Sequence, residues 1–379
     1  MILKALKYGS NWFGKNWSIK SGSTNDDYVD FNNINLIVGR NASGKTKFIS
    51  CLRWLSDLFE DSISSGFQSL YFETIFQDNN DIIKYDVNID ENNTFLNETL
   101  SINNDNKLDR KRGKLYYENL EQFVDFQVDD DVLVSSRRDS LQQPFFEMLH
   151  SWGKNVSHYP FGEKMGRLRF EQIDDDNNLK NIHFKNYHKV RLIYHRAIKN
   201  MGLQFEKEII NDMKIIDYNI TSINSEISGS SPVLSVQESD LPFTTNFENM
   251  SQGMSRAFSL LVQLNYSLMT KIPSCILIDD IGEGLDYERS RSLIELIIKK
   301  VEGSNVQLFM TTNDRFVMNS VPLKYWSVIH RESNKSVFYN YQNSKKTFDD
   351  FAFTGLNNFD FFATDFYRMG FEEFIETAQ

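Results

Sequence analysis

The sequence feature that most constrains the fold is a glycine-bounded stretch near the N-terminus, Gly39-Arg40-Asn41-Ala42-Ser43-Gly44-Lys45-Thr46. It matches the pattern G-x-x-x-x-G-K-[ST] at every fixed position. Residues 35–38 before it, Asn35 followed by three apolar residues, predict a short buried strand. Apolar side chains three and four apart over residues 47–55 predict an amphipathic helix after it. A strand that ends in such a loop and continues as a helix indicates a phosphate-binding fold.

The residue types of this loop fit a bound nucleoside triphosphate. A glycine-bounded loop that runs into a helix N-terminus points several backbone N–H groups at one anion, and the helix dipole adds favourable charge. We expect the Lys45 ammonium to reach the β- and γ-phosphates and the Thr46 hydroxyl to ligate Mg²⁺. The expected cofactors are therefore ATP and Mg²⁺. The residues expected to bind the nucleotide here are Gly39, Arg40, Asn41, Ala42, Ser43, Gly44, Lys45, Thr46 and Lys47.

Composition and cysteine usage favour a cytoplasmic protein. The chain has 379 residues, 40% of them hydrophobic, which is enough for one large domain or one domain with an inserted lobe. Cys51 and Cys275 lie in apolar runs, and buried free thiols fit a reducing cytosol better than a disulfide does. No apolar run approaches the roughly 20 residues of a membrane span, so no membrane partner is expected.

The charge balance limits how nucleic acid could be bound. With a formal net charge of −11, the field of the whole protein does not attract DNA, so DNA binding needs a local basic patch. Basic residues cluster at 110–114 and 137–138, where solvated loops are the commoner interpretation. The six histidines and two cysteines show no spacing that suggests a zinc site.

Short apolar runs separated by turn residues predict strands in the first third of the chain. Residues 1–31 indicate a hairpin of edge strands, and an antiparallel meander is expected after the first helix. After the meander, apolar residues at helical spacing predict two helices, and two further short strands are expected after them. The meander strands are expected at 70–76, 82–89, 96–102 and 114–117, the helices at 144–152 and 186–211, and the later strands at 213–220 and 233–236.

Polar motifs return in the last third of the chain. The stretch Asn249-Met250-Ser251-Gln252-Gly253-Met254-Ser255-Arg256 precedes an apolar-periodic helix. Residues 274–280 form an apolar run that ends in two carboxylates, as expected for a buried parallel strand with acids at its carboxyl end. The other expected elements are helices at 257–268 and 287–302, a strand with its following loop at 305–313, and a hairpin over 325–341. We expect the phenylalanine-dense tail, 348–374, to be mostly core, with a partner surface as the alternative.

In this order the motifs resemble the head of an ABC-type ATPase. The closest branch comprises the SMC (structural maintenance of chromosomes) proteins, the double-strand-break repair ATPases and the ATPase domains of OLD (overcoming lysogenization defect) family nucleases. The resemblance covers the N-terminal fifth and residues from about 245 to 331. It implies an α/β fold: an ABC-ATPase-like P-loop core, with a mixed sheet and flanking helices, plus the N-terminal antiparallel meander and an inserted helical lobe. The expected segments are 1–118, a nucleotide-binding lobe with the phosphate loop; 119–240, an inserted, largely helical lobe; and 241–379, a C-terminal ATPase lobe with the tail.

The resemblance also implies roles for residues outside the phosphate loop. Ser251 and Gly253 match the serine and the second glycine of the family signature, with Gln252 where a glycine is usual. In the family this loop begins a helix whose N-terminus faces the γ-phosphate held by the partner subunit. Asp279 matches the aspartate that holds Mg²⁺ through water. The remaining implied roles are water polarisation by Asp280, γ-phosphate sensing by Asn313, a position for Asp286 in the loop that crosses the dimer interface, and a catalytic contribution from Lys45.

Two of these positions depart from the family pattern. Asp280 stands where a glutamate is usual, which pulls the carboxylate back by one methylene, about 1.5 Å. A misplacement of that size costs about a hundredfold in rate. Asn313 stands where a histidine is usual; it can hydrogen-bond a phosphate or a water but carries no charge. We expect an ATPase that hydrolyses slowly or that uses ATP mainly to hold a dimer together.

The leading hypothesis is a nucleotide-driven switch in which two heads form a homodimer around two ATP molecules. By analogy with compact ATPases of this branch, it would act in prokaryotic defence or DNA repair with a separate effector protein, a nuclease or a toxin. The alternative is a DNA-binding structural ATPase that clamps duplex across the dimerised heads, with Lys111, Arg112, Lys189 or Arg191 as candidate contacts. A transporter ATPase is disfavoured by the unorthodox signature.

Overall fold

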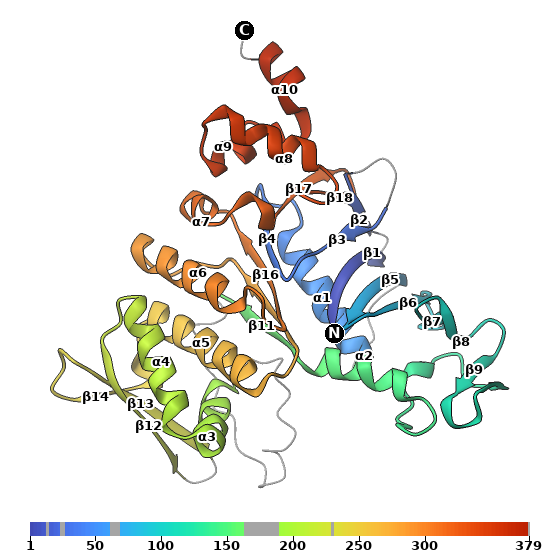
Figure 1. Cartoon of the computed structure of the whole chain (residues 1–379), viewed down its shortest axis with the longest axis horizontal. Coiled ribbons are helices and arrows are strands. Elements are labelled where there is room, and N and C mark those ends of the chain that lie inside the picture. Colours follow the sequence, from blue (N-terminus) through green and yellow to red (C-terminus); the bar gives the residue numbers. More distant parts are fainter. Residues whose placement is uncertain (13–14, 23–26, 61–68, 163–188, 229–230, 378–379) are drawn as a thin grey trace. The chain divides into compact units, whose positions relative to one another are not determined.

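The computed structural model describes residues 1–12, 15–22, 27–60, 69–162, 189–228 and 231–377 (Figure 1). Contact density divides the chain into two compact units, residues 1–154 with 322–379, and residues 155–321. Each unit has its own strands and helices. The boundaries of the expected segments 1–118, 119–240 and 241–379 differ from those of the two compact units, and these segments remain a prediction.

The first unit is built on a mixed sheet. Its strands are β1 (Ile2–Trp12), β2 (Lys15–Ser21), β3 (Val29–Asp30), β4 (Ile34–Gly39), β5 (Ser69–Asp78), β6 (Asp81–Ile89), β7 (Phe95–Ile102), β8 (Asp105–Asp109), β9 (Lys114–Tyr117), β10 (Gln122–Asp125), β17 (Trp326–Glu332) and β18 (Lys335–Asn340). They lie in the order β10-β9-β8-β7-β6-β5-β1-β2-β18-β17-β4, and β3 pairs with β1. The pairs β2–β18 and β4–β17 are parallel. The strands from β1 through β5 to β10 pair antiparallel.

The expected antiparallel meander is confirmed as β5, β6, β7 and β9, and the structure adds β8 and β10. Burial alternates along β5, so that Phe72 and Phe76 face the interior. The turn between β5 and β6 has Asn79 at a φ of 53°, a left-handed conformation that asparagine tolerates. Alternation and turn chemistry together explain why these strands could be recognised in the sequence.

The helices of the first unit are α1 (Lys45–Phe59), α2 (Pro144–Lys154), α8 (Lys345–Phe351), α9 (Asn358–Ala363) and α10 (Phe366–Thr377). The helix α1 buries the apolar face that its periodicity predicts, including Phe48 and Leu52. In the tail, the rings of Phe348 and Phe351 pack on Phe361, with centroids 4.6 and 5.0 Å apart. These three side chains are buried, which confirms the core interpretation for this part of the tail.

The second unit contains strands of two sheets. The strands β11 (Val156–Pro160), β15 (Ser274–Asp279) and β16 (Val306–Thr312) are parallel, with β15 in the middle. Every residue of β15 and β16 is buried, as expected for apolar runs in a parallel sheet. A smaller antiparallel sheet is formed by β12 (Ile220–Ser228), β13 (Ser231–Glu238) and β14 (Thr244–Asn246).

The helices of this unit are α3 (Val190–Met201), α4 (Leu203–Ile215), α5 (Gln252–Thr270), α6 (Tyr287–Val301) and α7 (Arg315–Ser320). The single helix expected over 186–211 is wrong within its described part. Gly202, with φ 63° and ψ −152°, separates α3 from α4. The strand expected at 213–220 is also wrong, because α4 continues to Ile215 and β12 begins at Ile220. The described part of the expected helical lobe, 119–240, therefore contains the strands β10, β11, β12 and β13 as well as the helices α2, α3 and α4.

Both cysteines are buried free thiols, as expected. Burial raises the pKa of each thiol, so neither is poised as a nucleophile. Among the described residues, no helix is long and apolar enough to cross a membrane.

Candidate functional site

The phosphate loop, residues 39–46, connects β4 to α1 in the first unit. The Lys45 ammonium turns back over the loop and donates hydrogen bonds to the carbonyl oxygens of Gly39 (2.8 Å) and Arg40 (3.3 Å). These carbonyls replace water around the ammonium, so Lys45 is only 8% exposed although it is charged. The loop is thus closed around one positive charge.

Two glycines of the loop are required by the space around them. A Cβ on Gly39 would lie 2.4 Å from Ser43 Oγ and 3.0 Å from the carbonyl oxygen of Ile329. Gly44 has a φ of 112°, and a Cβ there would lie 2.5 Å from Ser336 Oγ. The Ser43 hydroxyl is buried and has no hydrogen-bond partner among the described residues. A phosphate oxygen would satisfy that hydroxyl, so the loop fits the nucleotide that its sequence predicts.

Side chains from three strands support the loop, and sequence reasoning missed them. Trp17 Nε1 in β2 donates to Ser336 Oγ in β18 (3.0 Å), and this hydroxyl donates to the Ser43 carbonyl (2.9 Å). Arg331 in β17 donates to the carbonyl of Ala42 (3.2 Å), whose φ is 63°. These bonds hold the loop backbone in place. No local sequence signal marks them, because they depend on β2, β17 and β18 being neighbours in the sheet.

The outer residues of the loop have different surroundings. Arg40 pairs with Asp365 in the tail, with 3.1 Å between Nη2 and Oδ2. The Lys47 ammonium lies 5.5 Å from the centre of the Trp17 ring, a cation–π contact. Thr46 is exposed in the first turn of α1, where a hydroxyl can meet a ligand.

In the second unit, the acidic pair lies at the carboxyl end of β15. Thr311 of the neighbouring strand β16 donates its hydroxyl hydrogen to Asp279 Oδ1 (2.6 Å) and accepts from the backbone N–H of Asp280 (2.8 Å). Asp279 is 9% exposed. Asp280 has a φ of 56°, a left-handed conformation that aspartate, like asparagine, adopts more readily than most residues other than glycine. Thr311 thus fixes both acids, and Asn313 lies exposed just beyond the same strand.

The signature-like residues form the N-terminus of α5. Ser251 is the N-cap, and its hydroxyl oxygen accepts a hydrogen bond from the backbone N–H of Met254 (3.2 Å). Ser251 and Gln252 are exposed, whereas Gly253 is buried. A Cβ on Gly253 would lie 2.6 Å from the carbonyl oxygen of Gly284. The helix therefore meets the loop after β15 backbone to backbone.

Asp286 ends that loop and caps α6. Its Oδ1 accepts from the backbone N–H of Arg289 (3.0 Å) and its Oδ2 from the Arg289 guanidinium (2.8 Å). The backbone hydrogen bond and the charge of Arg289 hold the pKa of the Asp286 carboxyl below its usual range. The carboxylate at position 286 is therefore ionised at neutral pH.

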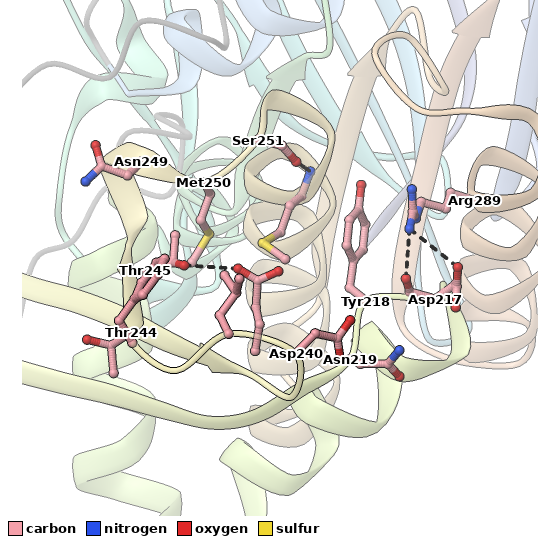
Figure 2. A pocket seen from close by; sticks show the side chains of 14 residues that line it. Asp217, Tyr218, Asn219, Asp240, Thr244, Thr245, Asn249, Met250, Ser251 and Arg289 are labelled. Atoms are coloured by element: carbon pink, nitrogen blue, oxygen red, sulfur yellow. Dashed lines mark hydrogen bonds and ion pairs between the residues drawn. The ribbon is translucent and has the colours of Figure 1, made fainter.

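A cavity of about 670 Å³ opens beside Ser251 (Figure 2). Figure 2 shows Arg289 directed at Asp217, and the two side chains are 3.4 Å apart between Nη2 and Oδ2. The same guanidinium lies 4.5 Å from the centre of the Tyr218 ring. Burial raises the pKa of Tyr218, and the charge of Arg289 partly offsets the effect. The acidic side chains that line the cavity are Asp217, Glu238 and Asp240.

The predicted site residues thus fall into two groups. The phosphate loop, residues 39–47, belongs to the first unit. Ser251, Gln252, Gly253, Asp279, Asp280, Asp286 and Asn313 belong to the second unit. Within the second unit the structure brings Gly253 against the loop that carries Asp286, and it places Asp279 and Asp280 on Thr311.

The phosphate loop, the mixed α/β sheets and the acidic strand end define a P-loop ATPase with the fold of an SMC-type ABC ATPase head. Residues 34–319 match the model of the family described as "AAA domain, putative AbiEii toxin, Type IV TA system". This match covers most of the chain, and the protein belongs to this family. No curated protein matches its sequence.

Solved structures confirm the fold. An SMC head bound to the C-winged helix domain of ScpA is 11% identical and superposes with a TM-score of 0.54, covering 89% of this chain and 97% of that chain. The SMC head domain with an extended coiled coil from Pyrococcus furiosus, bound to the C-terminal domain of ScpA, is 10% identical with a TM-score of 0.53. That match covers 92% of this chain and 99% of the other. The expected resemblance to SMC heads and the expected fold class are thus confirmed.

Proposed function

We propose that this ATPase is a nucleotide-driven switch in which two copies close around two ATP molecules. Each phosphate loop binds one nucleotide, with Lys45 on the β- and γ-phosphates. Ser251 of the opposite copy then faces the γ-phosphate of that nucleotide. Thr46 and Asp279 are the proposed Mg²⁺ ligands, the latter through water.

The observation that supports the dimer is the exposed N-terminus of α5. This helix has 19 residues, and Ser251 and Gln252 at its N-terminus are exposed. A helix N-terminus attracts an anion through its backbone N–H groups and its dipole. With the phosphate loop supplying the nucleotide, a second copy is the source of the γ-phosphate that Ser251 would meet.

Hydrolysis in this proposal is slow. Asp280 polarises the attacking water, and Asn313 contacts the γ-phosphate or that water. Because Thr311 fixes the backbone N–H of Asp280, the short carboxylate has little freedom to move toward a water placed for a glutamate. ATP therefore stays bound for long periods and holds the dimer closed.

The biological setting follows from the comparisons by analogy. The family description names a toxin of a type IV toxin–antitoxin system, and the SMC heads of similar fold bind a separate protein, ScpA. We infer that this ATPase acts in prokaryotic defence or DNA repair and controls a separate effector, a nuclease or a toxin. Phe353 in the tail is 85% exposed and is the strongest candidate for contact with such a partner.

A DNA clamp has weaker support. Arg191, one of its candidate contacts, is 6% exposed and forms an ion pair with Glu248 at 2.7 Å, so it is occupied within the fold. Arg110 of the basic cluster donates to the carbonyls of Val132 and Asp129 and is likewise a structural residue. Lys111 and Arg112 are exposed, but among the described residues these two adjacent side chains do not by themselves make a basic strip.

Native mass measurement with a non-hydrolysable ATP analogue tests the switch. With the analogue and Mg²⁺, the measured mass of the wild-type protein should change from that of a monomer to that of a dimer. The same measurement on protein purified from its host would show any partner chain. Ser251→Arg should bind the analogue as a monomer, because a bulky cation at the helix N-terminus blocks the opposite head. A Ser251→Arg variant that dimerises as wild type does would refute the proposed role of this loop.

A further inference from the structure

Arg256 lies in the second turn of α5, behind the exposed Ser251. Its side chain is buried, with 3% of the residue exposed. The guanidinium donates from Nη1 to the carbonyl oxygen of Glu283 (2.8 Å) and from Nη2 to that of Gly162 (3.0 Å). One cation thus joins the signature helix, the loop after β15 and the segment that follows β11.

The loop after β15 is shaped to receive this guanidinium. Gly284 has a φ of 80°, and a Cβ there would lie 2.0 Å from Arg256 Nη1. Gly253 of α5 in turn has no room for a Cβ, because the carbonyl oxygen of Gly284 lies 2.6 Å from that position. Two glycines and one arginine therefore fit together without space for an added methyl group.

The loop that Arg256 contacts connects two of the proposed site residues of the second unit. It begins at Asp280, whose carboxylate is proposed to polarise water, and it ends at Asp286, the cap of α6. The loop also returns to β16, since the Ile281 N–H donates to the Thr311 carbonyl (2.9 Å). Arg256 and Gly284 thus provide a continuous set of contacts between the N-terminal turns of α5 and the loop that begins at Asp280.

We propose that Arg256 is a positioning residue that couples the two nucleotide sites of the dimer, an inference that rests on the proposed function. In each copy, Ser251 faces the nucleotide of the opposite copy, whereas Asp280 acts on the nucleotide of its own copy. Arg256 joins the two elements, so the γ-phosphate at one site sets the position of the water-polarising carboxylate at the other. A displacement of about 1 Å at that carboxylate changes the rate by about a hundredfold.

The first experiment compares Arg256→Lys and Arg256→Met in the full chain. Binding of a non-hydrolysable analogue and analogue-dependent dimerisation should stay within about twofold of wild type, because neither variant alters the phosphate loop or Ser251. The kcat for ATP should fall by about a hundredfold in Arg256→Met and by less in Arg256→Lys, whose ammonium reaches one carbonyl. Arg291→Met, at an exposed arginine of α6, is the matched control and should keep full turnover.

The second experiment measures coupling directly in mixed dimers of differently tagged chains, one wild type and one Ser251→Ala. One of the two sites then keeps its complete set of residues. Independent sites would give half of the wild-type activity or more, which would overturn the proposal. Coupled sites should give well under half, because the altered copy no longer receives a signal at its own α5.

The outcomes separate this inference from the proposed function. A wild-type chain that stays monomeric with analogue and Mg²⁺ would refute the dimer and the coupling with it. A wild-type chain that dimerises, together with Arg256 variants of unchanged kcat, would refute the coupling alone. If the Arg256 variants lose nucleotide affinity and stability, measured as the unfolding midpoint, to the same extent as kcat, Arg256 stabilises the fold and does not couple the sites.

Discussion

The Arg40 guanidinium lies 3.1 Å from the Asp365 carboxylate, which joins the phosphate loop to the C-terminal helices. Asp365 lies between α9 and α10 with a φ of 55°, and it also accepts a hydrogen bond from the Tyr367 hydroxyl (3.1 Å). The tail thus presents a negative charge next to the loop where a triphosphate would bind. A nucleotide bound at this loop would compete with Asp365 for the positive charge of Arg40.

Asp365→Asn should tighten ATP binding. The substitution removes a negative charge near the phosphates and frees Arg40 to meet them. Exposed ion pairs are worth about 0.2–1 kcal/mol, so the gain in affinity should be about 1.4-fold to fivefold. A fluorescent-nucleotide titration would measure it, and the gain should shrink as salt rises. Asp350→Asn, which removes a charge from α8, should leave affinity unchanged; an equal gain there would assign the effect to overall charge.

Lys45→Ala should abolish ATP binding. The loop is closed around the Lys45 ammonium, and loss of that charge leaves the carbonyl oxygens of Gly39 and Arg40 facing the phosphates. Isothermal titration should detect no binding at nucleotide concentrations that saturate wild type. Arg53→Ala, at an exposed position on α1, should bind as wild type does. Nucleotide affinity that survives in Lys45→Ala would rule out the phosphate-loop assignment.

Thr311→Val should lower turnover more than it lowers ATP affinity. Valine has the shape of threonine but leaves Asp279 Oδ1 and the Asp280 N–H without their hydroxyl partner. An unsatisfied buried group costs about 1–3 kcal/mol, which should appear in the free energy of unfolding. Steady-state kinetics should show kcat reduced by roughly tenfold to a hundredfold. Thr311→Ser keeps the hydroxyl and should recover most of both quantities.

The phosphate loop and the acidic strand could be predicted because their chemistry needs given residue types at fixed spacings within one short segment. The family match and the SMC-head fold agree with that expectation. Thr311 could not be predicted as the residue that fixes Asp279 and Asp280, because its role depends on β16 lying beside β15. Residues such as Trp17 and Ser336 act on the phosphate loop from distant parts of the chain, and no local pattern reveals such contacts.

The errors in the fold prediction have a common physical cause. The apolar residues keep their helical spacing on both sides of Gly202. The sequence pattern therefore does not show that the non-helical backbone of Gly202 separates α3 from α4. The strand expected at 213–220 begins with apolar residues that instead complete the buried face of α4, including Met213. Short apolar runs are ambiguous between helix and strand until their packing partners are known. The strand expected at 233–236 forms the middle of β13 (Ser231–Glu238), whereas no strand was expected over most of β12 (Ile220–Ser228), whose burial does not alternate.

Asp86→Asn should stabilise the first unit at neutral pH. Asp86 faces Glu73 across β5 and β6, and burial together with the Glu73 charge raises its pKa to about 6. The unfolded carboxyl ionises near pH 4, so the folded state loses stability as pH rises from about 4 to about 6. Asparagine removes that loss and still accepts the hydrogen bond from Thr99.

The expected gain for Asp86→Asn above pH 6 is up to about 2 kcal/mol, after allowance for solvent screening of a partly exposed group. Urea unfolding at pH 4 and pH 7.5 would measure it, and the two proteins should differ only at the higher pH. Asp105→Asn, at an exposed strand position, should show no such difference. Equal stability of Asp86→Asn and wild type at pH 7.5 would mean that the two carboxylates do not repel each other in solution.

Asp280→Glu and Asp280→Asn should change turnover in opposite directions. Glutamate extends the carboxylate by about 1.5 Å toward the position that the family uses, so kcat should rise by up to about a hundredfold. Asparagine cannot polarise water as a base, so ATP should persist in the closed dimer and turnover should disappear. Residue 280 has a φ of 56°, which asparagine tolerates and glutamate does not favour. The unfolding midpoint of Asp280→Glu should therefore drop while its kcat rises, and a kcat that falls with it would show that the shorter acid is suited to this site.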